Sequence, residues 1–290
     1  MSLTFDHSPE GKVEENSSDC TGSLLDTDFV RRCFSGADLA RLAVEPLFIG
    51  LDRDGTLVPI FAEQSLAVLD ERVRLAIDQL TACSKTTVAI VSARSTTRLK
   101  QDCFPLRTIL AGNYGLEMCF SDGSAHIQKE ALAALPQLRR LRQIIAEELE
   151  SILPVSTDDH VLSLCLHYHF VPESERQVVH LKILELSRQF ADLHFRALPT
   201  SYEVLPPLAW NKADSLSWIA GKFGFTAEST CFLYIGDSEA DEPAFRWCNQ
   251  SGGISILVNR SKPEGSAAKY RLASTGQVLA FLQYLTSIRE

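Results

Sequence analysis

The 290-residue sequence has no apolar run that approaches the ~18 residues a bilayer-spanning helix needs. Its beginning also lacks the positive patch and apolar core of a secretory signal peptide. Basic residues are in deficit, because 28 lysines and arginines stand against 37 aspartates and glutamates, for a formal net charge of -9. That charge repels a nucleic-acid backbone. We therefore expect a cytoplasmic protein that binds neither nucleic acid nor a membrane.

Metal-binding cysteine patterns are missing as well. The eight cysteines are scattered, with no CxxC pair and no Cys/His spacing suited to zinc, so we expect reduced thiols. What the sequence does have is a hydrophobic content of 45%. At this length, that content supports a substantial core in two domains or in one large domain.

Strand-like and helix-like segments alternate through most of the sequence, which predicts a parallel sheet with crossover helices. The expected strands are 47–52, 86–92, 107–112, 230–236 and 254–259, and the expected helices include 65–80, 211–223, 241–248 and 274–288. The alternation stops after about residue 120. There a hairpin near 121–123 precedes a helix at 130–153, a strand within 161–170, a helix at 174–190 and short strands near 193–198 and 201–206.

This change of pattern predicts one domain inserted into another. We expect a core formed by 45–121 and 200–290, with an inserted α+β domain at 122–199. A helical segment at 25–44 should pack on the core. Residues 1–24 are polar and rich in Ser, Glu, Asp and Gly, a composition that favours a disordered tail.

Two apolar strands end in aspartate. Asp52 follows one and Asp237 follows the other, and each has a second aspartate close behind, Asp54 and Asp241. The carboxyl ends of parallel strands form a ligand crevice, so these side chains should meet there. Carboxylates in a crevice repel one another unless a cation lies among them, and their hard oxygens suit Mg²⁺. The alternative is that each aspartate belongs to an ordinary turn or helix cap.

A hydroxyl and an ammonium group lie at two expected helix starts. Ser92 ends a strand and precedes a helix, where backbone N–H groups and the hydroxyl could bind an anion. Lys212 lies in the first turn of a helix that Asn211 could cap, where the helix dipole disfavours a cation unless something negative is near. A phosphate would satisfy both sites. The alternatives are an N-cap serine and a solvent-exposed lysine.

The order Asp-x-Asp-Gly-Thr, Ser, Lys, then Gly-Asp with another Asp four residues on resembles the haloacid dehalogenase superfamily of phosphotransferases. Within it, the blocks "LDRDGTLVPI", "VSARS", "AGNYGLE", "LSLCLHYH", "EVLPPLAWNKADSL" and "YIGDSEADEPAF" are similar to those of trehalose-6-phosphate phosphatases. The resemblance runs from about residue 45 to 260. It implies a Rossmann-like α/β core with the inserted domain as a cap.

The resemblance also implies hydrolysis of a phosphate monoester through an aspartyl-phosphate. Asp52 would be the nucleophile. Asp54 would give a proton to the leaving oxygen, and we expect crowded, acidic surroundings to keep its carboxyl protonated. Ser92 and Lys212 would bind the phosphoryl oxygens.

The metal and substrate sites implied by the resemblance follow the same motifs. Mg²⁺ would be held by Asp52, the backbone carbonyl of Asp54 and Asp237, with Asp241 orienting ligands or water. The candidate contacts to a phosphosugar are Arg94, Asn113, Glu117, Asp158, His160 and His167.

The inserted domain departs from the family pattern where the sugar would be bound. Leu205 replaces the arginine before Pro-Pro, and Asp158 and His160 stand where the family usually carries a Glu-x-Lys pair. We expect trehalose 6-phosphate as the substrate. The alternatives are a phosphatase for sucrose 6-phosphate or a glycosyl-phosphoglycerate, a sugar phosphomutase, and a catalytically silent regulatory protein with the same fold. The sequence does not indicate an oligomeric state.

Overall fold

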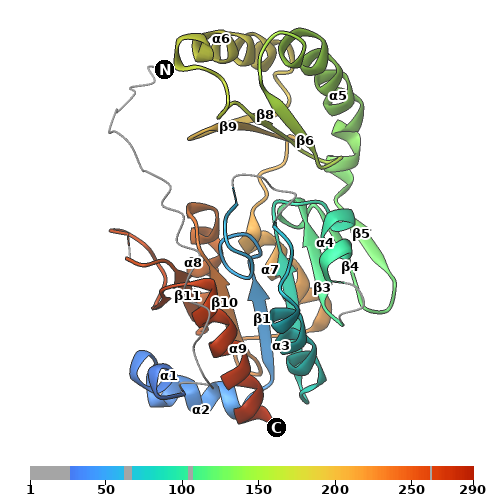
Figure 1. Ribbon diagram of the computed structural model, residues 1–290. Helices are drawn as coiled ribbons and strands as arrows, with labels where there is room; N and C mark the ends of the chain where they lie inside the picture. The colour runs from blue at the N-terminus through green and yellow to red at the C-terminus, as the bar shows by residue number, and fades with distance from the viewer. Residues whose placement is uncertain (1–26, 62–66, 104–106, 262) are drawn as a thin grey trace.

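The computed structural model describes residues 27–61, 67–103, 107–261 and 263–290, which two sheets organise (Figure 1). The larger sheet is parallel over six strands and continues through two antiparallel strands. In spatial order its strands are β12 (Tyr270–Leu272), β11 (Ile254–Val258), β10 (Cys231–Gly236), β1 (Leu47–Leu51), β2 (Thr86–Val91), β3 (Ile109–Gly112), β4 (Glu117–Cys119) and β5 (Ala125–Ile127). The predicted α/β fold is thereby confirmed.

Helices cover both faces of the larger sheet, which explains why its central strands are apolar throughout. Along β1, Leu47 and Ile49 join the hydrophobic core on one face, while Phe48 joins the core on the other. The first face packs against α1 (Thr27–Cys33), α2 (Gly36–Val44), α3 (Glu71–Ala82), α4 (Thr96–Cys103) and α9 (Thr275–Arg289). The second packs against α7 (Lys212–Phe223) and α8 (Glu242–Gln250).

The smaller sheet is antiparallel and lies above the carboxyl ends of the parallel strands (Figure 1). Its order is β6 (Ser156–Asp159), β7 (Leu164–His167), β9 (Ser201–Leu205) and β8 (His194–Leu198). Helices α5 (Lys129–Ile145) and α6 (Glu173–Gln189) cover its outer face, and α5 continues into a π-helical turn, η3 (Ala146–Glu150). Leu164 and Leu166 pack against these helices, so Cys165 and His167 point to the opposite face, toward the larger sheet.

Sheet membership differs from the expected domain boundaries at both ends of the insertion. Strand β5 pairs with β4, so residues 125–127 extend the larger sheet although the insertion was expected to begin at 122. Strand β9 pairs with β7 and β8, so residues 201–205 belong to the smaller sheet although the core was expected to resume at 200. We propose residues 129–205 as the cap domain. The expected tail at 1–24 lies outside the described residues.

One predicted helix begins later than its apolar periodicity suggested. The helix expected at 65–80 starts at Glu71, because the Asp70 side chain accepts a hydrogen bond from Arg72 N and caps it. Residues 67–70 precede it without helical structure, and residues 65 and 66 lie outside the described part.

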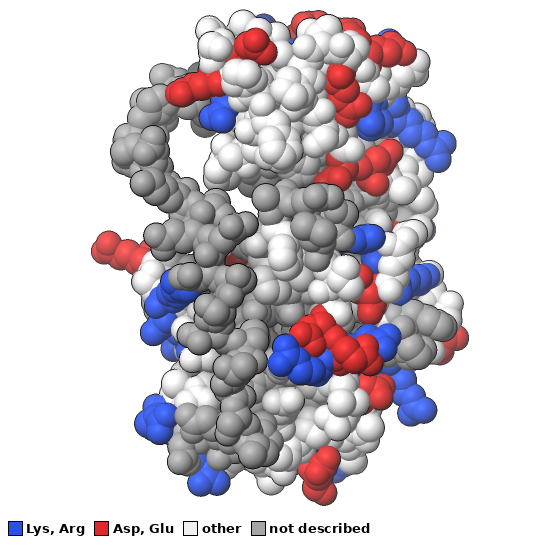
Figure 2. Space-filling view, in the orientation of Figure 1, with Lys and Arg blue, Asp and Glu red and all other residues white. Residues whose placement is uncertain are grey.

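Charge is mixed on the surface. On the face that Figure 2 shows, the lysine and arginine groups are interspersed with aspartate and glutamate groups, over both sheets. Among the helices of the described residues, none combines the length and the apolar character that crossing a membrane requires.

Gly112 allows a close approach that shapes the loop after β2. A Cβ at Gly112 would lie 2.8 Å from Arg94 O and closer still to Thr96 N, both backbone atoms. Because backbone cannot move aside cheaply, Gly112→Ala should lower the free energy of unfolding by about 1–3 kcal/mol, the usual cost of overpacking. Urea denaturation measures this.

The matched control for that substitution is Gly36→Ala, at the start of α2. A Cβ at Gly36 meets nothing within 4 Å, so its denaturation midpoint should stay near that of the unmodified protein. Equal midpoints for the two variants would contradict the prediction.

Candidate active site

Two adjacent strands deliver carboxylates to the same edge of the sheet. Leu51 at the end of β1 pairs with Ile235 near the end of β10, and Asp52 and Asp237 follow these strands. Asp52 N donates to Ile235 O at 2.9 Å, which extends the β1–β10 pairing by one residue. Carboxylate oxygens of Asp52, Asp237 and Asp241 lie within 4.8 Å of one another. The structure thus brings together three carboxylates that the sequence singled out.

Lys212 is the cation of this cluster. Asn211 caps α7 through Ala213 N, and this cap fixes Lys212 as the first residue of the helix. The lysine is only 3% exposed, and its Nζ donates to Asp52 Oδ1 and Asp241 Oδ1, both at 2.6 Å. The alternative that Lys212 is an ordinary solvent-exposed lysine is therefore wrong. The negative partners required near this helix start are the two carboxylates.

Asp241 uses both of its oxygens on protein partners. Oδ1 accepts from Lys212 Nζ and from Tyr234 OH, the latter at 2.6 Å. Oδ2 accepts from Asp237 N at 3.1 Å, and from Ser238 N at 3.0 Å and Ser238 Oγ at 2.9 Å. This saturation suits Asp241 to orient Lys212 and the Asp237 loop rather than to bind a metal ion directly.

The cluster contains three carboxylates and one ammonium group, and the pKa shifts of these groups follow from that excess of negative charge. Burial raises the pKa of Asp52 although Lys212 opposes it, and burial together with the charge of Asp52 raises the pKa of Asp237. Burial also acts to raise the pKa of Asp241, but Lys212 outweighs it and the net shift is downward. Burial acts to lower the pKa of Lys212, and the two carboxylates beside it reverse this, so the pKa rises. The cluster therefore has room for one more positive charge.

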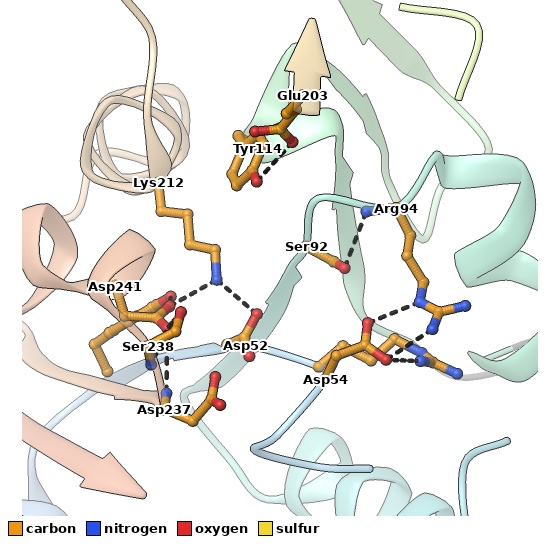
Figure 3. A network of polar contacts seen from close by, with 12 residues as sticks. Asp52, Asp54, Ser92, Arg94, Tyr114, Glu203, Lys212, Asp237, Ser238 and Asp241 are labelled. Carbon is orange, nitrogen blue, oxygen red and sulfur yellow. Dashed lines mark hydrogen bonds and ion pairs between the residues drawn. The ribbon is translucent and has the colours of Figure 1, made fainter. Parts of the chain in front are cut away.

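The donor set fits a small divalent cation. Carboxylate oxygens at this spacing are the ligands that Mg²⁺ prefers, together with water and phosphate oxygens. Gly55, with φ of 85°, lies against Asp237, and a Cβ there would overlap that carboxylate. Because protein partners already occupy both oxygens of Asp241, Asp52 and Asp237 are the side chains placed to hold the ion. The Asp54 side chain turns away from them (Figure 3), which leaves its backbone carbonyl as the only ligand it could offer.

Asp54 lies between two arginines. Arg94 binds its carboxylate with two hydrogen bonds, Nε to Oδ2 at 2.7 Å and Nη2 to Oδ1 at 2.9 Å (Figure 3). Arg53 Nη1 donates to Oδ1 at 2.6 Å. Acidic neighbours were expected around Asp54, but the side chains that hydrogen-bond to its carboxylate are two guanidinium groups.

Ser92 lies at the end of β2, between the Asp52 and Asp54 side chains (Figure 3). It is buried, and its Oγ accepts a hydrogen bond from Arg94 N at 3.2 Å. The hydroxyl hydrogen can therefore be donated to an anion bound in front of Asp52. Ser92 is not the N-cap of α4, which begins at Thr96, and anion binding by its hydroxyl stays a prediction.

A cavity of about 270 Å³ opens between the two sheets next to Asp54. Of the six candidate sugar contacts, Arg94, His160 and His167 line it, and Asp158 hydrogen-bonds to His167 Nε2 at 2.9 Å. The lining residues are Asp54, Ile60, Phe61, Ala67, Ala93, Arg94, Tyr114, His160, Cys165, His167, Leu198, Ser201 and Glu203.

The other two candidate sugar contacts do not line this cavity. Asn113 is fully buried; its Nδ2 donates to Glu117 Oε1 at 2.7 Å and to His160 O at 3.1 Å, and its Oδ1 accepts from Ser163 Oγ at 2.6 Å. Glu117 also accepts from the backbone N and the hydroxyl of Thr96 at the start of α4. In this structure, Asn113 links the core to the cap and Glu117 holds a helix start.

Several polar residues near the cavity escaped the sequence reasoning. Tyr114 OH donates to Glu203 Oε1 and accepts from Arg196 Nη2, both at 2.8 Å, and Arg196 also pairs with Glu203. The sequence signal that could have found this group is Glu203, a charged residue inside an expected strand and followed by apolar residues. Tyr234 and Arg53 gave a similar signal, since a hydroxyl in an apolar strand and an arginine beside one both need partners.

Comparison with protein families decides what this site belongs to. Residues 50–276 match the family model for trehalose-phosphatase. The chain belongs to the trehalose-phosphatase family. Its members are phosphoric monoester hydrolases, and we assign the chain to that class of enzyme.

One relative in sequence and two solved structures illustrate what this chain is similar to. Trehalose 6-phosphate phosphatase RA3 of Zea mays is 27% identical over 266 residues, which cover 86% of this chain and 72% of the maize protein. The C-terminal domain of a C. albicans trehalose-6-phosphate phosphatase superposes with a TM-score of 0.71 at 19% identity, covering 87% of this chain and 96% of that one. The C-terminal domain of a Candida albicans trehalose synthase regulatory protein gives 0.63 at 13%, covering 87% and 98%. The two solved structures establish a shared fold alone.

The His167–Asp158 pair in the cap should make stability depend on pH. Its hydrogen bond raises the pKa of His167 to about 10 and lowers the pKa of Asp158. The His167 contribution is then complete below about pH 6.5, the unfolded value, and is lost as pH rises toward 10. The Asp158 contribution is present above about pH 4 and is lost in more acidic solution.

Asp158→Asn should therefore lower the free energy of unfolding near neutral pH by about 1 kcal/mol or less, since the pair is partly exposed. Urea denaturation of both proteins from pH 6 to 10 measures the difference. It should shrink as His167 loses its proton. A difference that stays constant over this range would contradict the prediction.

Proposed function

We propose that this protein hydrolyses the phosphate monoester of a sugar, with trehalose 6-phosphate as the preferred substrate, using Mg²⁺ and an aspartyl-phosphate intermediate. The observation that carries the proposal is the position of Asp52. It is a buried carboxylate at the end of β1, held by Lys212 and accompanied by Asp237 and Ser92. This arrangement supports in-line attack on a phosphoryl group bound in front of β1.

The proposed reaction has two steps. A carboxylate oxygen of Asp52 attacks phosphorus, the P–O bond to the sugar breaks, and the leaving oxygen takes a proton from Asp54. Water then attacks the phosphorus of the aspartyl-phosphate and gives a proton to Asp54, while the P–O bond to Asp52 breaks and inorganic phosphate leaves. Two moderate barriers replace one very high barrier.

The charge that develops in both transition states needs fixed positive groups. Lys212 and the Ser92 hydroxyl would bind the phosphoryl oxygens, and Asp241 keeps Lys212 in place. Mg²⁺ held by Asp52, Asp237 and the backbone carbonyl of Asp54 would neutralise further charge and orient the phosphoryl group.

The cavity between the sheets supports a sugar phosphate as substrate. It opens beside Asp54, which is where the leaving sugar oxygen must lie, and Arg94, His160 and His167 offer it hydrogen-bond donors. The substrate of the maize relative supports trehalose 6-phosphate in particular. Because Leu205 and His160 depart from the family pattern, another glycosyl phosphate remains the second candidate.

Phosphate release with Mg²⁺ tests the catalytic proposal. Asp52→Asn keeps the shape of the side chain but removes the nucleophile, so kcat should fall by roughly four orders of magnitude or more. The substrate panel is trehalose 6-phosphate, sucrose 6-phosphate, glucosyl-phosphoglycerate and para-nitrophenyl phosphate. No release from any of them by the unmodified protein would favour the catalytically silent alternative. Equal kcat/KM over the three sugar phosphates would contradict the preference for trehalose 6-phosphate.

Mg²⁺ should also stabilise the folded protein, because it binds an acidic cluster that exists only there. At a hundredfold excess over Kd the gain is about 2.7 kcal/mol, seen as a rise in Tm. Asp237→Asn should remove most of this rise. The control is Asp192→Asn, an acidic residue on the cap surface, far from the cluster, that accepts a hydrogen bond from Gln137. A rise that persists unchanged in Asp237→Asn would place the ion elsewhere.

A further inference from the structure

The two arginines that bind Asp54 are both buried but face different surroundings. Arg53 is 1% exposed and does not line the cavity, while Arg94 is 7% exposed and forms part of the cavity wall. The side chain of Asp54 between them is 35% exposed. One partner of this carboxylate is therefore enclosed in protein, and the other faces the space that a substrate would enter.

Arg53 is fixed at both ends. Its carbonyl oxygen accepts from Leu57 N at 2.8 Å and Val58 N at 2.9 Å, which closes the turn after β1. Its Nη2 donates to Ala67 O and to the carboxylate of Asp102 on α4, itself nearly buried. A buried guanidinium that lost these partners would leave an uncompensated charge, so Arg53 cannot swing away.

Arg94 has no such second anchor among the described residues. The hydrogen bonds from its Nε and Nη2 both go to Asp54. Phosphate and sugar oxygens that enter the cavity can therefore replace Asp54 as its partners, with the same charge-assisted geometry. Such an exchange would free Oδ2 of Asp54, which among the described residues is held by Arg94 Nε alone, while Arg53 keeps Oδ1 in place.

We propose that Arg53 is the positioning residue for Asp54 and that Arg94 is its exchangeable partner, which turns to the substrate. Oδ2 is then the atom that carries the proton to the leaving oxygen, with its direction set by Arg53 through Oδ1. Asp102 acts one step further back, by holding the Arg53 guanidinium. This inference rests on the proposed function, because it assigns proton transfer to Asp54.

The leaving group separates positioning from general structural support. A sugar alkoxide needs a proton to leave, whereas para-nitrophenolate leaves readily without one. Arg53→Gln should lower kcat/KM for trehalose 6-phosphate by about 10²-fold, the usual contribution of a positioned acid, because kcat/KM reports the step in which the sugar oxygen leaves. For para-nitrophenyl phosphate, kcat/KM should fall by less than about tenfold. Arg94→Gln should instead raise KM for trehalose 6-phosphate, by about tenfold for a lost charged hydrogen bond.

Two further variants guard against a trivial loss of fold. Asp102→Asn leaves Arg53 and Asp54 in the chain but removes the anchor, so it should shift the ratio of the two kcat/KM values in the same direction as Arg53→Gln. The control is Leu99→Ala, on the same helix and fully buried, which should lower Tm but leave the ratio unchanged.

The outcomes are distinguishable. If kcat/KM falls by the same factor for both substrates in Arg53→Gln and in Asp102→Asn, Arg53 has only a structural role. The inference is then overturned while the proposed function stands. If the unmodified protein releases phosphate from neither substrate, the proposed function fails and the inference fails with it.

Discussion

The buried ammonium group of Lys212 is the interaction on which the site depends. It lies between Asp52, which directly follows β1, and Asp241, in the short 3-10 turn after β10, and it is nearly inaccessible to water. Without it the two acidic groups could not both stay charged in a buried crevice. Asn211, the N-cap of α7, fixes the position of Lys212, and the Tyr234 hydroxyl donates a hydrogen bond to Asp241. A helix start and the middle of a strand therefore both hold the ion pair in place.

The parts of this site that the sequence predicts are those carried by local patterns. An apolar strand that ends in Asp52 or Asp237, and a helix that starts at Lys212, can each be recognised within about ten residues. The rules of parallel sheets then bring their ends together. The fold class followed from the same alternation of strands and helices, and both buried faces of β1 explain its unbroken apolar run.

The parts that the sequence did not predict depend on packing between distant elements. Arg53 meets Asp102 across 49 positions and Tyr114 meets Glu203 across 89, and no local pattern specifies either pair. The same holds for element boundaries. Leu69 packs in the core although it precedes the helix, so its apolar character extended the expected helix past the Asp70 cap. The sheets to which β5 and β9 belong were not predicted, because pairing partners decide sheet membership and the sequence does not specify those partners.

A shared fold does not by itself carry activity, since similar architectures serve different functions. In this chain, Lys212 already holds Asp52 and Asp241, and Arg94 already holds Asp54. A small free anion such as inorganic phosphate therefore finds both of these cations paired. It must compete with carboxylates already in place, whereas a phosphosugar has many more groups with which to do so. Internal neutralisation of this kind should make inorganic phosphate bind more weakly than a whole phosphosugar.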